Sequence, residues 1–273
     1  MPIRSLLAQV SRANRELTER QRSLDYELKM AREVQMRLVP SGPMCIGRVC
    51  FDFLYRPSGE IGGDMFDVTP LDDGRVAMAL ADASGHGVGA GLVAVMVRMI
   101  CRSYGLDRGD PAAMLAAINE ELEQIVPPGQ FATAFYAVCD WEARELAYAA
   151  AGHPMPLLLR SDGDAVERLG EAGLPLGSLK DVGYDGQSIE FAPGDKMLLF
   201  TDGLLDAQNV DGERFGYGRL GRLAERHSGR SGPEFLHAVV QGVEEFTEGR
   251  EASDDMTVAL VESLTEERVE QWR

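Results

Sequence analysis

Residues 76–87 read VAMALADASGHG, an apolar run that ends in an aspartate and a glycine-rich turn. The apolar part, Arg75 to Asp82, has the length and composition of a buried β-strand, and the two glycines favour a tight turn after it. Asp82 is therefore expected at the rim of a buried sheet, where water is partly excluded. The glycines also let the backbone approach a ligand closely, so the carbonyl group of Ala83 could serve as a ligand.

Three further motifs bring aspartates to tight turns, at points where strands are expected to end. They are Gly62-Gly63-Asp64-Met65-Phe66-Asp67, Thr201-Asp202-Gly203 and Ser253-Asp254-Asp255-Met256-Thr257. Clustered carboxylates raise one another's pKa unless a cation neutralises them. Oxygen ligands without His or Cys select Mg²⁺, Mn²⁺ or Ca²⁺ over zinc. One Asp-Gly pair is usually a plain turn, but four such motifs together predict a site for divalent cations.

The composition narrows the class of protein. The chain has 273 residues, 45% hydrophobic and 26% charged, which is typical of a globular protein and excludes a disordered one. The formal net charge is −17, and residues 1–40 carry eight basic and five acidic side chains, which leaves −20 on the remainder. Such a body repels phosphate backbones and anionic lipid, so we expect no nucleic-acid and no membrane partner.

The cysteines and the hydropathy of the chain indicate its cellular compartment. Cys45, Cys50, Cys101 and Cys139 lack the paired short spacings of a zinc site, and we expect four reduced, buried thiols. The first residues carry no apolar core of signal-peptide length, and no stretch approaches the roughly 20 apolar residues of a membrane span. These observations favour a cytoplasmic protein.

Residues 1–40 are expected to form a helical arm. Apolar residues recur at intervals of seven, at Ile3, Val10, Leu17, Leu24, Ala31 and Leu38. Arg20 and Glu27 interrupt the companion positions, and Pro40 ends the helix. This pattern is typical of a parallel coiled-coil dimer, and a single amphipathic helix that packs on its own domain is the alternative.

The rest of the chain alternates short β-rich runs with helical patterns. Strands are predicted at 48–55, 75–82, 131–140, 146–151, 156–160, 187–191, 196–201 and 256–261. Helices are predicted at 88–104, at 111–125 with Asp110 as N-cap, at 233–246, and from Phe215 to about His227. Consecutive strands with short turns predict an α+β fold of largely antiparallel sheets with helices outside, in one compact domain.

Five motifs in register make the prediction more specific. They are Gly62-Gly63-Asp64, Asp82-Ala83-Ser84-Gly85-His86-Gly87, Ala151-Gly152-His153-Pro154, Phe200-Thr201-Asp202-Gly203 and Asp254-Asp255-Met256-Thr257. In this order and spacing, residues 44–262 resemble the bacterial SpoIIE/RsbU branch of the metal-dependent PPM protein phosphatases. Residues 34–40 also resemble the linker that leads into such domains.

The resemblance implies a β-sandwich of two antiparallel sheets flanked by helices, with two Mn²⁺ or Mg²⁺ ions at one end. By the family motif, Asp82 would bridge both ions, the Ala83 carbonyl would bind one, Asp202 and Asp254 would hold the other, and Asp64 would complete the set. Asp64, Asp82 and Asp202 are thus the candidate catalytic residues. Asp67 and Asp255 would lie outside the direct ligands.

For other residues near these motifs, a structural role is an alternative to a catalytic one. His86 could orient a water molecule or a leaving group, or could simply donate a local hydrogen bond. His153 is expected to fix a turn, and Ser84 lacks the partners of a nucleophilic triad. No arginine is evident where eukaryotic relatives bind phosphate, so substrate affinity would come from the metal ions and protein contacts.

The activity implied by the resemblance is metal-dependent hydrolysis of phosphoserine or phosphothreonine on a protein. The expected substrate is a STAS-type anti-sigma-factor antagonist in a partner-switching pathway. The domain organisation would be a helical arm at 1–40, a phosphatase domain at 44–262 and a tail at 263–273. The arm would form a homodimer or receive an activating protein. Two alternatives are a non-catalytic dimeric scaffold and a metal-dependent nucleotide phosphodiesterase, which the negative charge disfavours.

Overall fold

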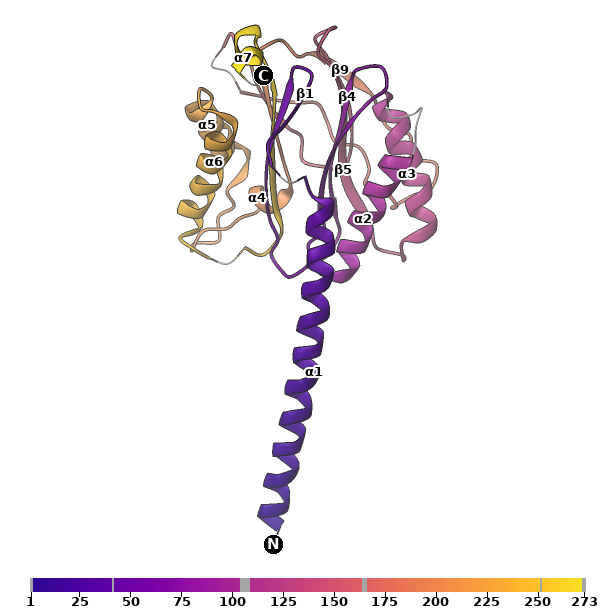
Figure 1. Cartoon of the computed structure of the whole chain (residues 1–273), viewed down its shortest axis with the longest axis vertical. Helices are drawn as coiled ribbons and strands as arrows, with labels where there is room; N and C mark the ends of the chain where they lie inside the picture. Colours follow the sequence, from indigo (N-terminus) through magenta and orange to yellow (C-terminus); the bar gives the residue numbers. More distant parts are fainter. Residues whose placement is uncertain (1, 41, 104–108, 164–165, 251, 272–273) are drawn as a thin grey trace. The chain divides into compact units, whose positions relative to one another are not determined.

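The computed structural model describes residues 2–40, 42–103, 109–163, 166–250 and 252–271, which divide into two compact units at Leu38. The first unit is one continuous helix, α1 (Pro2–Leu38), drawn in indigo in Figure 1. Two residues of its seven-residue repeat, Leu17 and Leu24, are 62% and 59% exposed. The predicted helix is confirmed, and it ends two residues before Pro40.

None of the helices in the described ranges combines the length and the apolar character that crossing a membrane requires.

The second unit, from Val39 onward, is a sandwich of two antiparallel sheets. The first sheet has the order β1 (Met44–Ile46), β2 (Val49–Arg56), β11 (Met256–Ser263), β10 (Lys196–Phe200), β7 (Leu157–Leu159) and β8 (Val166–Arg168). The second has the order β3 (Asp64–Pro70), β4 (Val76–Ala83), β5 (Ala132–Asp140), β6 (Glu145–Ala151) and β9 (Gln187–Glu190). The expected α+β architecture is confirmed.

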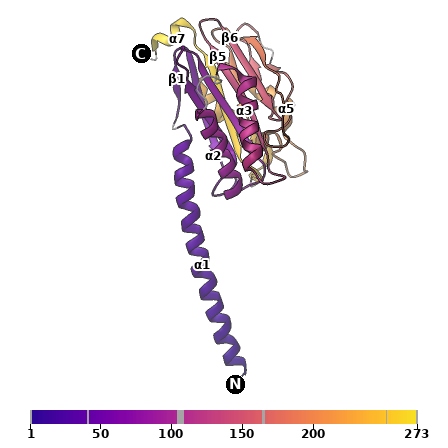
Figure 2. The same cartoon turned by 90° about the vertical axis from the view of Figure 1, so that its right-hand side faces the viewer.

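Helices cover the outer face of each sheet, as Figures 1 and 2 show. The second sheet packs against α2 (Val88–Ser103) and α3 (Pro111–Ile125), and the first against α5 (Gly216–His227) and α6 (Gly232–Thr247). Two short helices, α4 (Asp202–Leu205) and α7 (Glu266–Gln271), complete the unit. The bounds of α3 and α5 match the prediction, while the predicted end of α2 at Tyr104 lies outside the described residues.

The start of α3 confirms its predicted N-cap. The carboxylate of Asp110 accepts hydrogen bonds from the backbone N–H groups of Ala112 and Ala113, at 2.9 and 3.1 Å. Pro111 occupies the first turn, where its missing N–H costs nothing. Local sequence chemistry therefore fixes where this helix begins.

Strict alternation on β4 divides the hydrophobic core into layers. Val76, Met78 and Leu80 pack between the two sheets, and Ala77, Ala79 and Ala81 pack against α2 and α3. The small alanines leave room for the helix backbones, and the larger side chains fill the space between the sheets. The same period of two decides the face on which Asp82 lies.

Two expectations about local structure were wrong. Asp64 begins β3, a strand that was not predicted, and Asp254 precedes β11, so neither follows the end of a strand as expected. Cys45 and Cys50 form a disulfide, in place of the expected reduced thiols. They lie directly opposite each other in the β1–β2 hairpin with their Cα atoms 4.1 Å apart, a proximity that the pairing of the strands creates. Cys101 and Cys139 lie outside this disulfide and are buried, as expected.

Candidate active site

The side chains of the predicted site reach one end of the sandwich because the strand period places them there. Asp82 continues the row of Leu80 on β4, which faces the other sheet, and the β3–β4 register pairs Asp82 with Asp64. Across the sandwich, Thr201 follows β10 and Thr257 lies on β11, each in the row that faces inward. Four polar residues thus extend the inner rows to the same end.

Asp64 is held across the two sheets. Its Oδ2 accepts hydrogen bonds from the hydroxyl groups of Thr201, at 2.9 Å, and Thr257, at 2.5 Å. The Thr257 N–H in turn donates to the Thr201 hydroxyl oxygen at 3.0 Å. The other carboxyl oxygen, Oδ1, is buried and has no hydrogen-bond partner among the residues that the structure describes. Burial raises the pKa of Asp64 to about 7, although both hydroxyl groups act in the opposite direction.

Asp82 is the most strongly perturbed acid of the group. Burial, followed by the negative charges of Asp64, Asp202 and Asp254, raises its pKa to about 9. Asp82 and Asp202 share a side-chain hydrogen bond, in which a protonated Asp82 donates. A proton between two carboxylates occupies the place where a cation could neutralise both.

Asp202 and Asp254 complete the acidic cluster from the first sheet. Burial is the largest cause of the raised pKa of each, and nearby carboxylates add to it. Asp202 begins α4 directly after β10, and Asp254 precedes β11. The structure therefore gathers the four predicted aspartates, Asp64, Asp82, Asp202 and Asp254, close enough to perturb one another.

Two glycines permit the close backbone approach that this arrangement needs. The Ala83 N–H donates to the Gly63 carbonyl at 3.1 Å, and a Cβ added to Gly63 would lie only 2.8 Å from the Ala83 carbonyl oxygen. A Cβ on Gly203 would lie 2.0 Å from the carbonyl oxygen of Asp255. Any side chain at either position would force the backbone strands of the cluster apart.

The carboxylates of Asp67 and Asp255 accept hydrogen bonds from groups outside the cluster of four aspartates. Arg102 of α2 donates two hydrogen bonds to the Asp67 carboxylate, both at 2.8 Å, and Arg98 approaches the same group at 3.1 Å. The Asp255 carboxylate accepts from the N–H groups of Ser58 and Gly63, at 2.6 and 2.5 Å. Asp67 therefore joins β3 to α2, and Asp255 fixes the loop that leads into Asp64.

The remaining polar residues have distinct surroundings. His86 is exposed, and its charge lowers the pKa of Asp254. The Ser84 hydroxyl accepts the N–H of Phe131 at 3.0 Å, and thus aligns the start of β5. His153 is buried beside the Thr133 hydroxyl, with 2.9 Å between Nδ1 and Oγ1, and burial lowers its pKa to about 3. His153 is therefore neutral and contacts β5, and its expected role in fixing a turn stays a prediction.

The donor set fits hard divalent cations in its chemistry. It consists of carboxylates with raised pKa values, and the buried Oδ1 of Asp64 lacks a partner. Among the residues that the structure describes, however, no three acidic, His or Cys side chains form a complete metal-binding group. Backbone carbonyl groups and water would therefore have to supply further ligands, as is usual for Mg²⁺.

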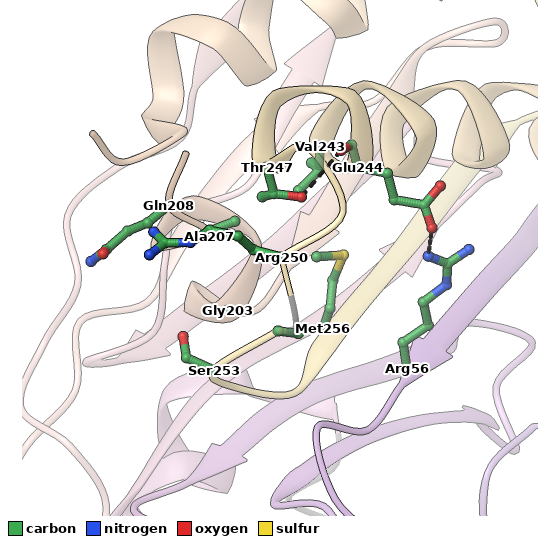
Figure 3. A pocket seen from close by; sticks show the side chains of 11 residues that line it. Arg56, Gly203, Ala207, Gln208, Val243, Glu244, Thr247, Arg250, Ser253 and Met256 are labelled. Atoms are coloured by element: carbon green, nitrogen blue, oxygen red, sulfur yellow. Dashed lines mark hydrogen bonds and ion pairs between the residues drawn. The ribbon is translucent and has the colours of Figure 1, made fainter. Parts of the chain in front are cut away.

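A pocket of about 650 Å³ opens on one side of the cluster. Gly203 and Ser253, the neighbours of Asp202 and Asp254, form part of its wall, and Figure 3 shows the Met256 side chain beside it. On the opposite wall Arg56 forms an ion pair with Glu244, the contact dashed at the right of Figure 3. The sequence did not predict this pocket, because its walls come from separate elements.

Sequence comparison identifies related proteins with a known activity. The phosphoserine phosphatase RsbP of Bacillus subtilis is 24% identical over 184 residues, which are 66% of this chain and 45% of RsbP. The phosphoserine phosphatase RsbU of the same organism is 25% identical over 243 residues, 88% of this chain and 71% of RsbU. This chain therefore spans less than half the length of RsbP.

Solved structures share the fold, and a family model matches most of the unit. The SiaA-PP2C domain of Pseudomonas aeruginosa superposes with a TM-score of 0.78 at 24% identity, covering 90% of this chain and 98% of that domain. The catalytic domain of the phosphatase PstP, solved with two manganese ions, gives 0.60 at 17% identity, over 80% of this chain and 99% of that domain. Residues 72–263 match the model for stage II sporulation protein E, SpoIIE. The chain belongs to the SpoIIE family.

Proposed function

We propose that this protein is a metal-dependent phosphatase that hydrolyses phosphoserine or phosphothreonine on a protein substrate. The observation that carries the proposal is Asp82, whose pKa is raised to about 9 among three further aspartates from both sheets. A cluster of this kind stabilises a bound divalent cation and, through it, an incoming phosphate. The activities of RsbP and RsbU support the same reaction.

The residue assignments follow the geometry and the family motif. Asp82 would bridge two Mn²⁺ or Mg²⁺ ions, the Ala83 carbonyl would bind one of them, and Asp202 and Asp254 would hold the other. Asp64 would complete the set through Oδ1, since the hydroxyl groups of Thr201 and Thr257 occupy Oδ2. When bound, two such ions supply an activated water and neutralise the charge of the phosphoryl group.

The proposed substrate is a phosphorylated STAS-type protein of a partner-switching pathway in the cytoplasm. The acidic body supports a protein substrate over a nucleic acid, because free phosphate polymers would be repelled. In this proposal residues 44–262 form the phosphatase domain, residues 1–40 the arm and residues 263–273 a tail.

The arm is proposed to form a homodimer or to bind an activating protein. Exposed leucines in a repeat of seven on α1 support pairing with a second apolar helix. Deletion of residues 1–40 would test this role, with oligomeric state measured by light scattering and activity measured beside it. If both stayed unchanged, the arm would have neither role.

The phosphatase proposal is tested by hydrolysis of an aryl phosphate and a phosphoserine peptide, with Mn²⁺ and with chelator. We expect Mn²⁺-dependent turnover that Asp82→Asn and Asp202→Asn abolish, while Asp185→Asn, a change at an exposed aspartate, leaves it intact. Absence of both turnover and Mn²⁺ binding by calorimetry would favour the non-catalytic scaffold. Hydrolysis of a cyclic nucleotide but not of the phosphopeptide would favour the phosphodiesterase.

A further inference from the structure

A second hollow, of about 550 Å³, is lined in part by Asp202. Asp202 and Leu205 of α4 form one wall, and Arg168 and Tyr217, from β8 and α5, form another. Its volume falls within the range of roughly 300–1,000 Å³ that small ligand sites occupy. A proposed metal ligand and an arginine therefore face the same space.

The arginine of this hollow is held in place by an aromatic ring. The guanidinium carbon of Arg168 lies 5.1 Å from the centroid of the Tyr217 ring, which is the geometry of a cation–π contact. The ring itself is fixed, because its hydroxyl donates to the Met155 carbonyl at 3.2 Å and its edge packs on Phe200 at 5.7 Å. Such stacking orients the guanidinium group and leaves its N–H donors available.

Other arginines near the site have their charge satisfied by a carboxylate. Arg56 of the larger pocket pairs with Glu244, and Arg219, which stacks on Phe246 at 4.5 Å, also pairs with Glu213 at 3.0 Å. Within the described part of the chain, no acidic side chain forms a salt bridge with Arg168. An oriented guanidinium group without an anion, on the wall of the proposed active site, is suited to bind an oxyanion of a ligand.

We propose that Arg168 binds an oxyanion of the protein substrate in the hollow beside Asp202, either the phosphoryl group itself or a carboxylate next to the phosphorylated residue. Both are planar or tripodal sets of oxygens that accept paired N–H donors from arginine. Glu171 also lines the hollow, so it would repel a free anion there. A phosphorylated substrate bound to the metal ions that the aspartates would hold could overcome this repulsion. This inference rests on the proposed phosphatase function.

The test compares three substrates in the full-length protein with Mn²⁺: an aryl phosphate, a phosphoserine peptide with acidic neighbours, and the same peptide with neutral neighbours. We expect Arg168→Ala to raise KM about tenfold with little change in kcat. If the oxyanion is the phosphoryl group, KM rises for all three substrates. If it is a carboxylate of the substrate, KM rises for the acidic peptide alone.

Two further variants control for charge and for stacking. Arg168→Lys keeps the charge but loses the paired donors, and we expect an intermediate KM. Arg219→Ala removes the other stacked arginine, and we expect unchanged KM values for all three substrates. KM values for Arg168→Ala within twofold of the unmodified protein would overturn the role of Arg168 and leave the phosphatase standing. An inactive unmodified protein with Mn²⁺ would instead overturn the phosphatase itself, and this inference with it.

Discussion

Two buried aspartates on β3 show how one strand serves two purposes. Asp64 and Asp67 are 4% and 3% exposed and lie three residues apart, so they point to opposite faces of the sheet. Asp67 faces α2 and accepts hydrogen bonds from Arg102, with Arg98 close by. Asp64 faces the other sheet, where its neighbours are two hydroxyl groups and further carboxylates.

Asp64 and Asp67 differ in the source of the positive charge that neutralises them. A buried carboxylate is stable only when it is paired or protonated. For Asp67 the protein supplies two guanidinium groups, and the contact serves the packing of α2 on the sheet. For Asp64 and Asp82 the described residues supply no guanidinium group, and their raised pKa values leave a proton, or a metal ion, to neutralise them.

The largest expected effect is a difference in turnover between variants of Asp64 and variants of Asp67. We expect Asp64→Asn to lower Mn²⁺-dependent turnover of an aryl phosphate by more than about 100-fold, because loss of a group that holds or orients a metal ion costs at least 10- to 100-fold. Asp67→Asn should lower it by less than about tenfold. Similar losses in both variants would contradict a division of roles along β3.

The free energy of unfolding should depend more on the ion pairs of Asp67 than on Asp64, which is the opposite of the order in activity. Arg98→Ala leaves Asp67 with only one guanidinium group, and we expect the free energy of unfolding to fall by about 2 kcal/mol, as for one lost contact between charged groups. Asp64→Asn removes a carboxylate that is costly to ionise, so in chelator it should leave stability unchanged or raise it. Urea unfolding of both variants in chelator measures the contrast, and a destabilised Asp64→Asn would contradict it.

The acidic cluster should also make stability depend on pH. Because the pKa values of Asp64 and Asp82 are raised to about 7 and about 9, the folded chain binds more protons than the unfolded chain above pH 4. In chelator the Tm should therefore fall as the pH rises from 7 to 9, above the range in which the lowered pKa of His153 acts in the opposite direction. We expect Asp82→Asn to flatten this slope and Mn²⁺ to counteract it. An equal slope in Asp82→Asn would show that Asp82 does not titrate in this range.

The smallest expected effect concerns an acid whose partners are backbone groups. Asp110→Ala removes the N-cap of α3, and we expect a loss of about 1 kcal/mol in the free energy of unfolding with unchanged turnover. Asp110→Asn is the matched control, since its side-chain oxygen can still accept both N–H groups. A loss of activity in Asp110→Ala would show that α3 is coupled to the acidic cluster.

Much of the fold follows from short-range patterns. The apolar run from Arg75 to Asp82 predicted β4, and Asp110-Pro111 predicted the start of α3, because both signals act between residues close in the chain. β1, β3 and β8 were missed. β3 carries Asp64 and Asp67 among apolar residues and ends in a proline, and β1 and β8 have only three residues each, so none of them has a clear strand pattern.

The sequence predicted the acidic residues of the candidate site but not the residues that hold them in place. The turn motifs pointed to Asp64, Asp82, Asp202 and Asp254, and the structure brings these four together. Nothing in the sequence pointed to Thr201 and Thr257 as the groups that hold Asp64. They lie 137 and 193 residues from it, and only the packing of one sheet on the other brings the three side chains together.

By itself the sequence determined the arm, the helix starts, the strand period and the family, since each depends on local chemistry or on motif order. Only the tertiary structure decided which acids are neutralised by arginine, which cysteines are joined, and where Arg168 lies relative to Asp202. Each of these depends on the distance between segments far apart in the chain, which sheet pairing and layer packing set. The sequence therefore determines which acids are present, and the fold determines whether a buried acid is charged.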